Sequence, residues 1–252
     1  MLIAIHDRAL TLRNGRAELA GGAIRIDASH DEAGLVILQV GVSHLTLGEL
    51  PALHAFVSGV PVDIAIKLRS NGSSLHALAV SASGRVQIRN GGPGVIRHGF
   101  EEVGDNLVYH FMSAFEAFRR SGSEALLECV AVDLAFHNGV ALAKNSMALR
   151  TRRLHVRGGG RVDLNDESLD LVFKPEARNA IKLHSLKAVE KVRVRGPFVA
   201  PEIRLDSARL VGRAARFGLD VANLGGGAVF NRLLRGKSKP GLCAGAPGLK
   251  MP

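Results

Sequence analysis

The stretch from Leu126 to Phe173 alternates apolar and polar residues with a period of two. Because successive side chains of a β-strand point to opposite faces, this pattern predicts consecutive strands, each with one buried and one wet face. Asn138-Gly139 and Asn165-Asp166 interrupt the alternation with residues that accept the positive φ of tight turns. The predicted structure is an antiparallel meander with one continuous apolar face. The residues expected to line that face are Val130, Val132, Leu134, Phe136, Val140, Leu142, Leu154, Val156, Val162, Leu164, Leu169, Leu171 and Phe173.

Similar alternation flanks this stretch on both sides. Strands are predicted at residues 62–68 and 84–89 before it and at 192–194 and 203–205 after it, with a first hairpin turning at Asn14-Gly15. Residues 105–120 carry the strongest helix signal, because their apolar residues form one stripe. Shorter helices are predicted at 73–81 and 208–217. The predicted fold class is mainly β: an elongated, curved antiparallel β-groove or meander with one or two covering α-helices.

The pattern divides the chain into three regions. Residues 1–92 are interpreted as a β-rich partial groove segment, and residues 93–205 as a β-meander that includes the helix at about 105–120. Residues 206–252 are interpreted as a C-terminal helix and a flexible tail, because the chain from Gly236 onward is rich in Gly, Pro and Lys.

The charge balance favours anionic partners. The formal net charge is +10, which suits phospholipid headgroups or nucleic acid, although charges on solvated strand faces explain it equally well. A nucleic-acid binder would interleave aromatic residues with basic ones, whereas the single Tyr109 lies in a predicted helix. We therefore predict an anionic membrane surface rather than nucleic acid as the charged partner. Asp163 and Asp170 are expected to pair with some of the arginines on the polar strand faces, which are Arg153, Arg157, Arg161, Arg193 and Arg195.

No motif in the chain predicts catalysis. The histidines lack metal-ligand spacing, no serine lies in a nucleophile elbow, and Gly158-Gly159-Gly160 lacks the Lys-Ser/Thr of a phosphate loop. The glycine run is interpreted as a joint between two strands. We predict no catalytic, cofactor-binding or metal-ligating residue, no cofactor, and no enzymatic activity.

The chain carries no recognisable targeting segment. Its first residues lack a basic leader, and no run of 18 apolar residues occurs, so neither a signal peptide nor a transmembrane helix is expected.

Several short segments occur in an order that is more specific than alternation alone. They are Ala20-Gly21-Gly22, residues 84–91, the helix at 105–120, Leu127-Glu128-Cys129, residues 136–140, residues 158–164, residues 166–170 and residues 196–201. Over roughly the first 205 residues, this series resembles the C-terminal region of the AsmA family of bacterial envelope proteins. The anchor and the N-terminal half of that family are not matched.

The resemblance implies a location and a function. AsmA-like proteins are β-grooves anchored in the inner membrane that extend into the periplasm of Gram-negative bacteria. They are implicated in phospholipid transport between the two membranes and in outer-membrane biogenesis. The implied partners are phospholipid acyl chains and other envelope proteins, and the implied location is periplasmic or inner-membrane-associated. Two alternatives remain open: a non-transporting envelope scaffold that influences outer-membrane protein assembly, and a cytosolic basic protein that binds nucleic acid.

The resemblance also bears on the two cysteines. A periplasmic protein folds in an oxidising compartment, so Cys129 and Cys243 are suited to one disulfide. The alternative for Cys129 is a buried thiol at the start of a strand.

Overall fold

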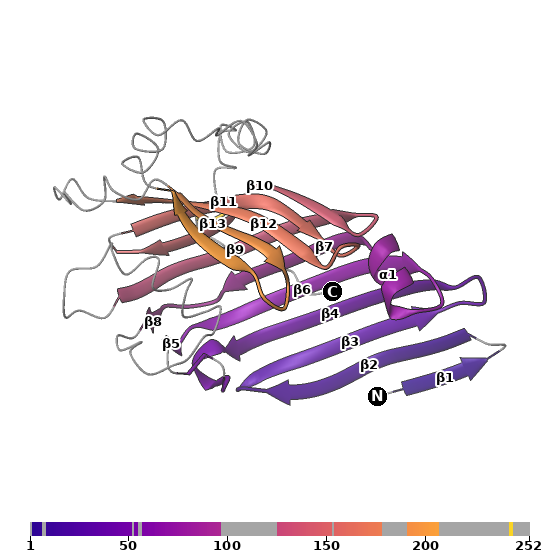
Figure 1. Cartoon of the computed structure of the whole chain (residues 1–252). Helices are drawn as coiled ribbons and strands as arrows, with labels where there is room; N and C mark the ends of the chain where they lie inside the picture. Colours follow the sequence, from indigo (N-terminus) through magenta and orange to yellow (C-terminus); the bar gives the residue numbers. More distant parts are fainter. Residues whose placement is uncertain are drawn as a thin grey trace, which may run out of the picture.

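The computed structural model describes residues 2–6, 9–51, 53–54, 57–96, 125–152, 154–177, 191–206 and 242–243. These residues form one open, curved, 14-stranded antiparallel sheet (Figure 1). The strands are β1 (Leu2–His6), β2 (Ala9–Leu19), β3 (Gly22–His30), β4 (Leu35–Thr46), β5 (Val57–Gly59), β6 (Pro61–Asn71), β7 (Ser83–Asn90), β8 (Gly94–Ile96), β9 (Ala125–His137), β10 (Val140–Thr151), β11 (Leu154–Asp163), β12 (Ser168–Ala177), β13 (Lys191–Pro197) and β14 (Glu202–Asp206). The predicted fold class, a mainly β groove or meander, is confirmed.

The sheet follows the order of the chain. Its main path runs from β1 to β14 through neighbouring antiparallel strands, and β5 and β8 form a short side branch next to β9. The predicted strands at 62–68, 84–89, 192–194 and 203–205 lie within β6, β7, β13 and β14. Because β7 pairs with β9, the sheet continues across the expected region boundary at residue 92.

One α-helix lies within the described residues. It is α1 (Leu75–Ser81), which falls inside the predicted helix at 73–81, and the Ser74 side chain caps it by accepting a hydrogen bond from the Ala77 amide. A short 3₁₀ turn, η1 (Leu47–Glu49), follows β4. The helices predicted at 105–120 and 208–217 lie outside the described residues, as does most of the expected flexible tail.

The prediction of a first hairpin turn at Asn14-Gly15 is wrong. Both residues lie inside β2, where the register with β3 shifts between Leu12 and Gly15. Asn14 does adopt a positive φ of 55°, but it forms a bulge, and its amide donates a 2.9 Å hydrogen bond to Asp27 Oδ1 of β3. The chain turns at Ala20-Gly21 instead, where φ is 47° and 70°.

The buried core sits at one end of the strands. Here η1, β5 and β8 gather beside β4, β6 and β9, and the buried cluster consists of Val42, Leu45, Val60, Val62, Ile96 and Leu127. The opposite end of the strands carries α1 (Figure 1). Backbone hydrogen bonds join the turns at that end: the Gly139 amide donates to Ala82 O, and the Leu164 amide donates to Gly139 O, both at 2.8 Å. These bonds hold α1 and the β9–β10 and β11–β12 turns together.

Candidate functional site

An unbroken row of apolar residues crosses the sheet from β2 to β13. Each member lies directly opposite the next on the neighbouring strand, so all of their side chains share one side of the sheet, which we call the apolar face. The row consists of Ala17, Ile24, Val42, Ile64, Ile88, Val132, Met147, Gly158, Phe173 and Val192. A second, shorter row beside it consists of Ile26, Val40, Ile66, Val86 and Leu134. The two rows contain no polar side chain.

The apolar face is only partly covered. In β2, Leu10 and Leu19 keep 46% and 51% of their surface exposed, whereas Val192 in β13 is fully buried. Most aliphatic residues between these two strands are half-buried. The face therefore offers hydrocarbon surface that becomes more accessible toward β2.

Ten of the thirteen residues predicted to line the apolar face lie on it. The register places there Val130, Val132, Leu134, Phe136, Leu154, Val156, Val162, Leu169, Leu171 and Phe173. The sheet brings these residues together with the apolar residues of β3 to β7.

The assignment of Val140, Leu142 and Leu164 to this face is wrong. Val140 pairs with His137 across the β9–β10 turn, so Val140 and Leu142 point to the opposite side, where Leu142 is 60% exposed. The inward positions of β10 belong to Ala141 and Ala143, which are almost fully buried. Leu164 lies in the turn after β11. The alternation along the chain predicts that every second residue of β10 lies on the apolar face. It does not show which set does, because alanines rather than larger apolar residues occupy those positions.

Residues 1–92 are predicted to form a partial groove segment, but none of them is among the residues predicted to line the apolar face. Ile64, Ile66, Val86 and Ile88 belong to the two apolar rows, and they extend the face found in the β9–β12 region. The period-two alternation of residues 62–68 and 84–89 carried this signal. What it lacked was the register that joins β7 to β9 across the long segment between β8 and β9.

Gly158 leaves room for the ring of Phe173. The two residues are cross-strand partners, and a Cβ added to Gly158 would lie 2.6 Å from the Cδ1 and Cε1 atoms of that ring. The Gly158-Gly159-Gly160 run lies inside β11, so its interpretation as a joint between strands is wrong. At Gly160, φ is +149° and a Cβ would lie 2.1 Å from Asp170 O, which requires glycine.

The opposite side of the sheet, which we call the charged face, carries ion pairs. Arg193 Nε lies 2.9 Å from Asp170 Oδ1, and Arg85 Nε lies 2.9 Å from Asp133 Oδ1. Further pairs join Arg157 to Glu176 and Arg161 to Asp163. The expected pairing of Asp163 and Asp170 with strand arginines is confirmed, while Arg153 lies outside the described residues.

Asp163 is the buried member of these pairs, with a side chain only 2% exposed. Burial by itself raises the pKa of this carboxyl group. Hydrogen bonds from the Arg161 side chain and from the Asn165 and Asp166 amides outweigh burial, so the pKa of Asp163 lies below its ordinary value of 3.8. The carboxylate thereby orders the turn between β11 and β12.

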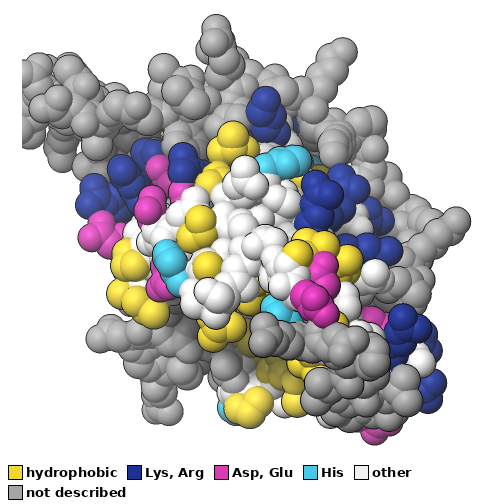
Figure 2. All heavy atoms as spheres, turned by 90° about the vertical axis from the view of Figure 1, so that its right-hand side faces the viewer, with side chains coloured by type: hydrophobic (Ala, Val, Ile, Leu, Met, Phe, Trp, Pro, Cys, Tyr) yellow, Lys and Arg dark blue, Asp and Glu magenta, His cyan; other side chains and the backbone are white. Residues whose placement is uncertain are grey.

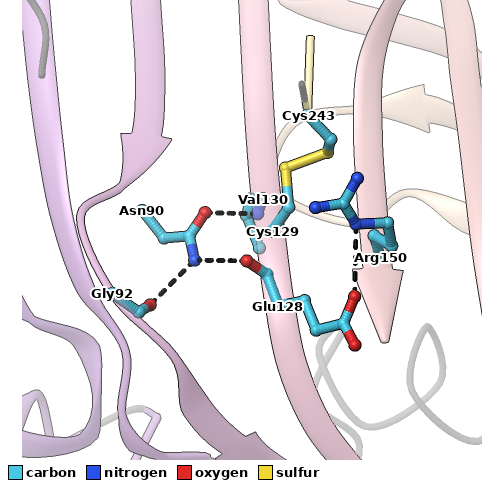
Figure 3. The surroundings of a disulfide bond; sticks show 7 residues. All are labelled: Asn90, Gly92, Glu128, Cys129, Val130, Arg150 and Cys243. Carbon is cyan, nitrogen blue, oxygen red and sulfur yellow. Dashed lines mark hydrogen bonds and ion pairs between the residues drawn. A yellow bond between two sulfur atoms is a disulfide. The ribbon is translucent and has the colours of Figure 1, made fainter. Parts of the chain in front are cut away.

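A disulfide joins Cys129 to Cys243, the pairing that the AsmA resemblance implied (Figure 3). The two Cα atoms lie 5.8 Å apart, and the bond closes a loop of sequence separation 114 that contains β10 to β14. Cys129 pairs with Arg150 and lies on the charged face, opposite to Val130. Cys243 is thus attached to the charged face.

Asn90 supports β9 beside this disulfide (Figure 3). Its Oδ1 accepts a 2.7 Å hydrogen bond from the Val130 amide, and its Nδ2 donates to Glu128 O at 3.3 Å. The β9–β10 register shifts at Glu128, so the Asn90 side chain takes over hydrogen bonds that a regular ladder would make with backbone groups.

The described residues contain no group of three or more His, Cys, Asp or Glu side chains arranged to hold a metal ion. Within the same residues, no helix has the length and apolar character needed to span a bilayer.

Comparison with known proteins gives no relative: no family model, no curated protein and no solved structure matches this chain.

Proposed function

We propose that the apolar face holds phospholipid acyl chains, and that the chain forms part of an AsmA-like envelope protein that moves phospholipid between the inner and outer membranes. The observation that carries the proposal is the unbroken apolar row from Ala17 to Val192, six of whose ten members are not buried. A conduit for acyl chains needs a continuous hydrocarbon surface and no catalytic group.

The length of the row suits lipid tails. It crosses ten strands of the sheet, from β2 to β13 along the main path. At about 4.8 Å between neighbouring strands, nine spacings give a path of roughly 43 Å. An acyl chain spans about half of a bilayer core ~30 Å thick, or roughly 15 Å. The face can therefore accommodate more than one acyl chain in succession.

The lining favours passage over tight retention. Each CH₂ group moved from water to an apolar surface gains about 0.8 kcal/mol, so an acyl chain gains enough to leave water. Since the lining between Ile24 and Val132 is uniformly aliphatic, neighbouring positions along the path differ little in affinity. A uniform surface allows a lipid to slide, whereas a deep specific pocket would hold it.

Site-specific photocrosslinking tests the proposal. A photoreactive benzoyl-phenylalanine replaces Phe173 on the apolar face, and in a matched control it replaces Lys174, the next residue of β12 on the charged face. After irradiation in a bacterial host, mass spectrometry is expected to detect phospholipid adducts at position 173 and not at position 174.

Two outcomes would count against the proposal. Absence of lipid adducts at position 173 in folded protein would favour the non-transporting scaffold. Equal adducts at both positions would indicate unspecific lipid contact. Fractionation of the host cells adds a test of location, because the proposal expects the crosslinked protein in the periplasmic or membrane fraction.

A further inference from the structure

Two cations face each other on neighbouring strands of the charged face. Lys67 of β6 and Arg85 of β7 are direct cross-strand partners, and Arg69 lies two residues further along β6 on the same side. Like charges directly opposite each other destabilise a sheet. Such a cluster therefore requires a compensating group or costs stability.

The described residues compensate only one of the three cations. Arg85 pairs with Asp133 of β9, but neither Lys67 nor Arg69 forms an ion pair with any residue that the structure describes. On β4, Lys67 lies opposite the uncharged Gln39, and Arg69 lies opposite Ile37. The cluster thus carries two positive charges in excess.

Another part of the same face distributes its charges differently. There Arg161, Asp170, Arg195 and Glu202 lie opposite one another in sequence across β11 to β14, so positive and negative charges alternate. This alternation is the arrangement that stabilises a solvated sheet face. The adjacent Lys67 and Arg85 depart from this alternation, and among the described residues only Asp133 offsets a charge of the cluster.

The three cations border a hollow with an apolar floor. This cationic depression has a volume of about 550 Å³, and its lining includes Ile37, Gln39, Lys67, Arg69, Arg85 and Ala135. Ile37 is 42% exposed, which leaves apolar surface directly beside the charges. A site that combines excess cations with exposed apolar surface suits an amphiphilic anion better than a free inorganic one.

The depression lies toward the α1 end of the sheet, where other large apolar side chains are exposed. Leu75 of α1 is 87% exposed, and Leu142, on the charged face of β10, is 60% exposed. Figure 2 looks at this end of the sheet and shows hydrophobic side chains with Lys and Arg to both sides and a few Asp and Glu side chains among them. Apolar tips flanked by cations are the pattern of a protein that rests on an anionic bilayer.

We propose that the cationic depression binds the phosphate group of an anionic phospholipid at a bilayer surface, with Ile37, Leu75 and Leu142 entering the interfacial region. Arginine and lysine both bind phosphate oxygens with charge-assisted hydrogen bonds. The depression lies on the charged face, opposite to the acyl-chain path, so this docking does not depend on the proposed transport function.

Vesicle co-sedimentation of the full chain tests the proposal. The protein is expected to bind vesicles of phosphatidylcholine mixed with phosphatidylglycerol and to bind vesicles of phosphatidylcholine alone much more weakly. Replacing both cations, Lys67→Gln with Arg69→Gln, should lower binding to the mixed vesicles by about tenfold or more. The matched control, Lys174→Gln with Arg195→Gln, removes the same charge from exposed positions of the charged face and should lower binding less than threefold.

Several results would overturn this docking site. Equal losses in the two double variants would mean that net charge alone drives binding. Displacement of the protein from vesicles by low millimolar inorganic phosphate would assign the site to free phosphate, and equal affinity for a DNA duplex would assign it to nucleic acid. Folding is checked separately: Lys67→Gln removes a like-charge contact, so it should leave the melting temperature unchanged or raise it. If the full chain does not bind the mixed vesicles but still forms lipid adducts at position 173, the docking site is refuted and the proposed function is not.

Discussion

His137 lies directly opposite Val140 across the two-residue Asn138-Gly139 turn. Both turn residues have positive φ, 48° and 76°, which matches the turn that joins two twisted strands most tightly. A turn of two residues leaves the register no freedom, so Phe136 must pair with Ala141 on the apolar face. This one turn therefore decides which face each residue at the start of β10 occupies.

The register predicts opposite outcomes for two leucines near this turn. Leu134→Asp puts a carboxylate on the half-buried apolar face and should lower the free energy of unfolding by about 2–3 kcal/mol. Leu142→Asp changes a residue that is 60% exposed on the charged face, and the effect should stay within about 0.5 kcal/mol. Urea unfolding followed by circular dichroism measures both values. Similar losses in the two variants would show that the register is wrong.

The Gly158–Phe173 contact predicts a coupled pair of mutations. Gly158→Ala brings a Cβ against the Phe173 ring and should cost about 1–3 kcal/mol, since one of the two must move. In a Phe173→Leu background the same change should cost clearly less, because the ring is gone. A double-mutant cycle of unfolding free energies measures this coupling. Additive losses of unfolding free energy would show that the Phe173 ring does not pack against Gly158.

Sequence reasoning recovered most strands but misplaced the first hairpin turn and the inward-facing residues at the start of β10. Asn and Gly accept positive φ in hairpin turns and in bulges alike, so Asn14-Gly15 could not be distinguished from the true turn at Ala20-Gly21. Likewise, Val140 and Leu142 resemble core residues more than Ala141 does. Only the pairing with β9 reveals that the small residue points inward.

Long-range features of the candidate sites were less accessible to sequence reasoning. The Lys67–Arg85 cross-strand pairing depends on the β6–β7 register, and α1 intervenes between those strands in the chain. Asn90 gives no sequence signal for its role, because its hydrogen bonds reach a bulge 38 and 40 residues away. Alternation predicts faces within a strand, whereas these features depend on which strands meet.

The pKa of Asp163 predicts a stability change in acid. Because the folded-state pKa lies below 3.8, the carboxylate stabilises the fold at pH values above about 3.8, and that contribution is lost as pH falls through the lower folded pKa. Asp163→Asn should therefore destabilise the protein at pH 6 and reduce the loss of stability between pH 5 and pH 3. Urea unfolding at several pH values across this range measures how steeply the free energy of unfolding falls with pH. Glu202→Gln is the control, because the Glu202 side chain is 68% exposed and should change the slope little. An unchanged acid slope in Asp163→Asn would contradict the assignment.

The disulfide predicts a localised effect of reduction. By chain entropy, a loop of this length contributes at most about 4–5 kcal/mol to the free energy of unfolding. Cys129→Ser and Cys243→Ser should each lose the contribution of the bond, with an added cost for the hydroxyl at the buried position 129, and the double variant should cost little more than Cys129→Ser alone. Hydrogen exchange should then increase around Leu242 while the β7–β9 pairing keeps its protection, since the Asn90 hydrogen bonds to Glu128 and Val130 do not involve sulfur. Thiol titration after expression in an oxidising compartment provides the direct check, and two free thiols per chain would refute the bond.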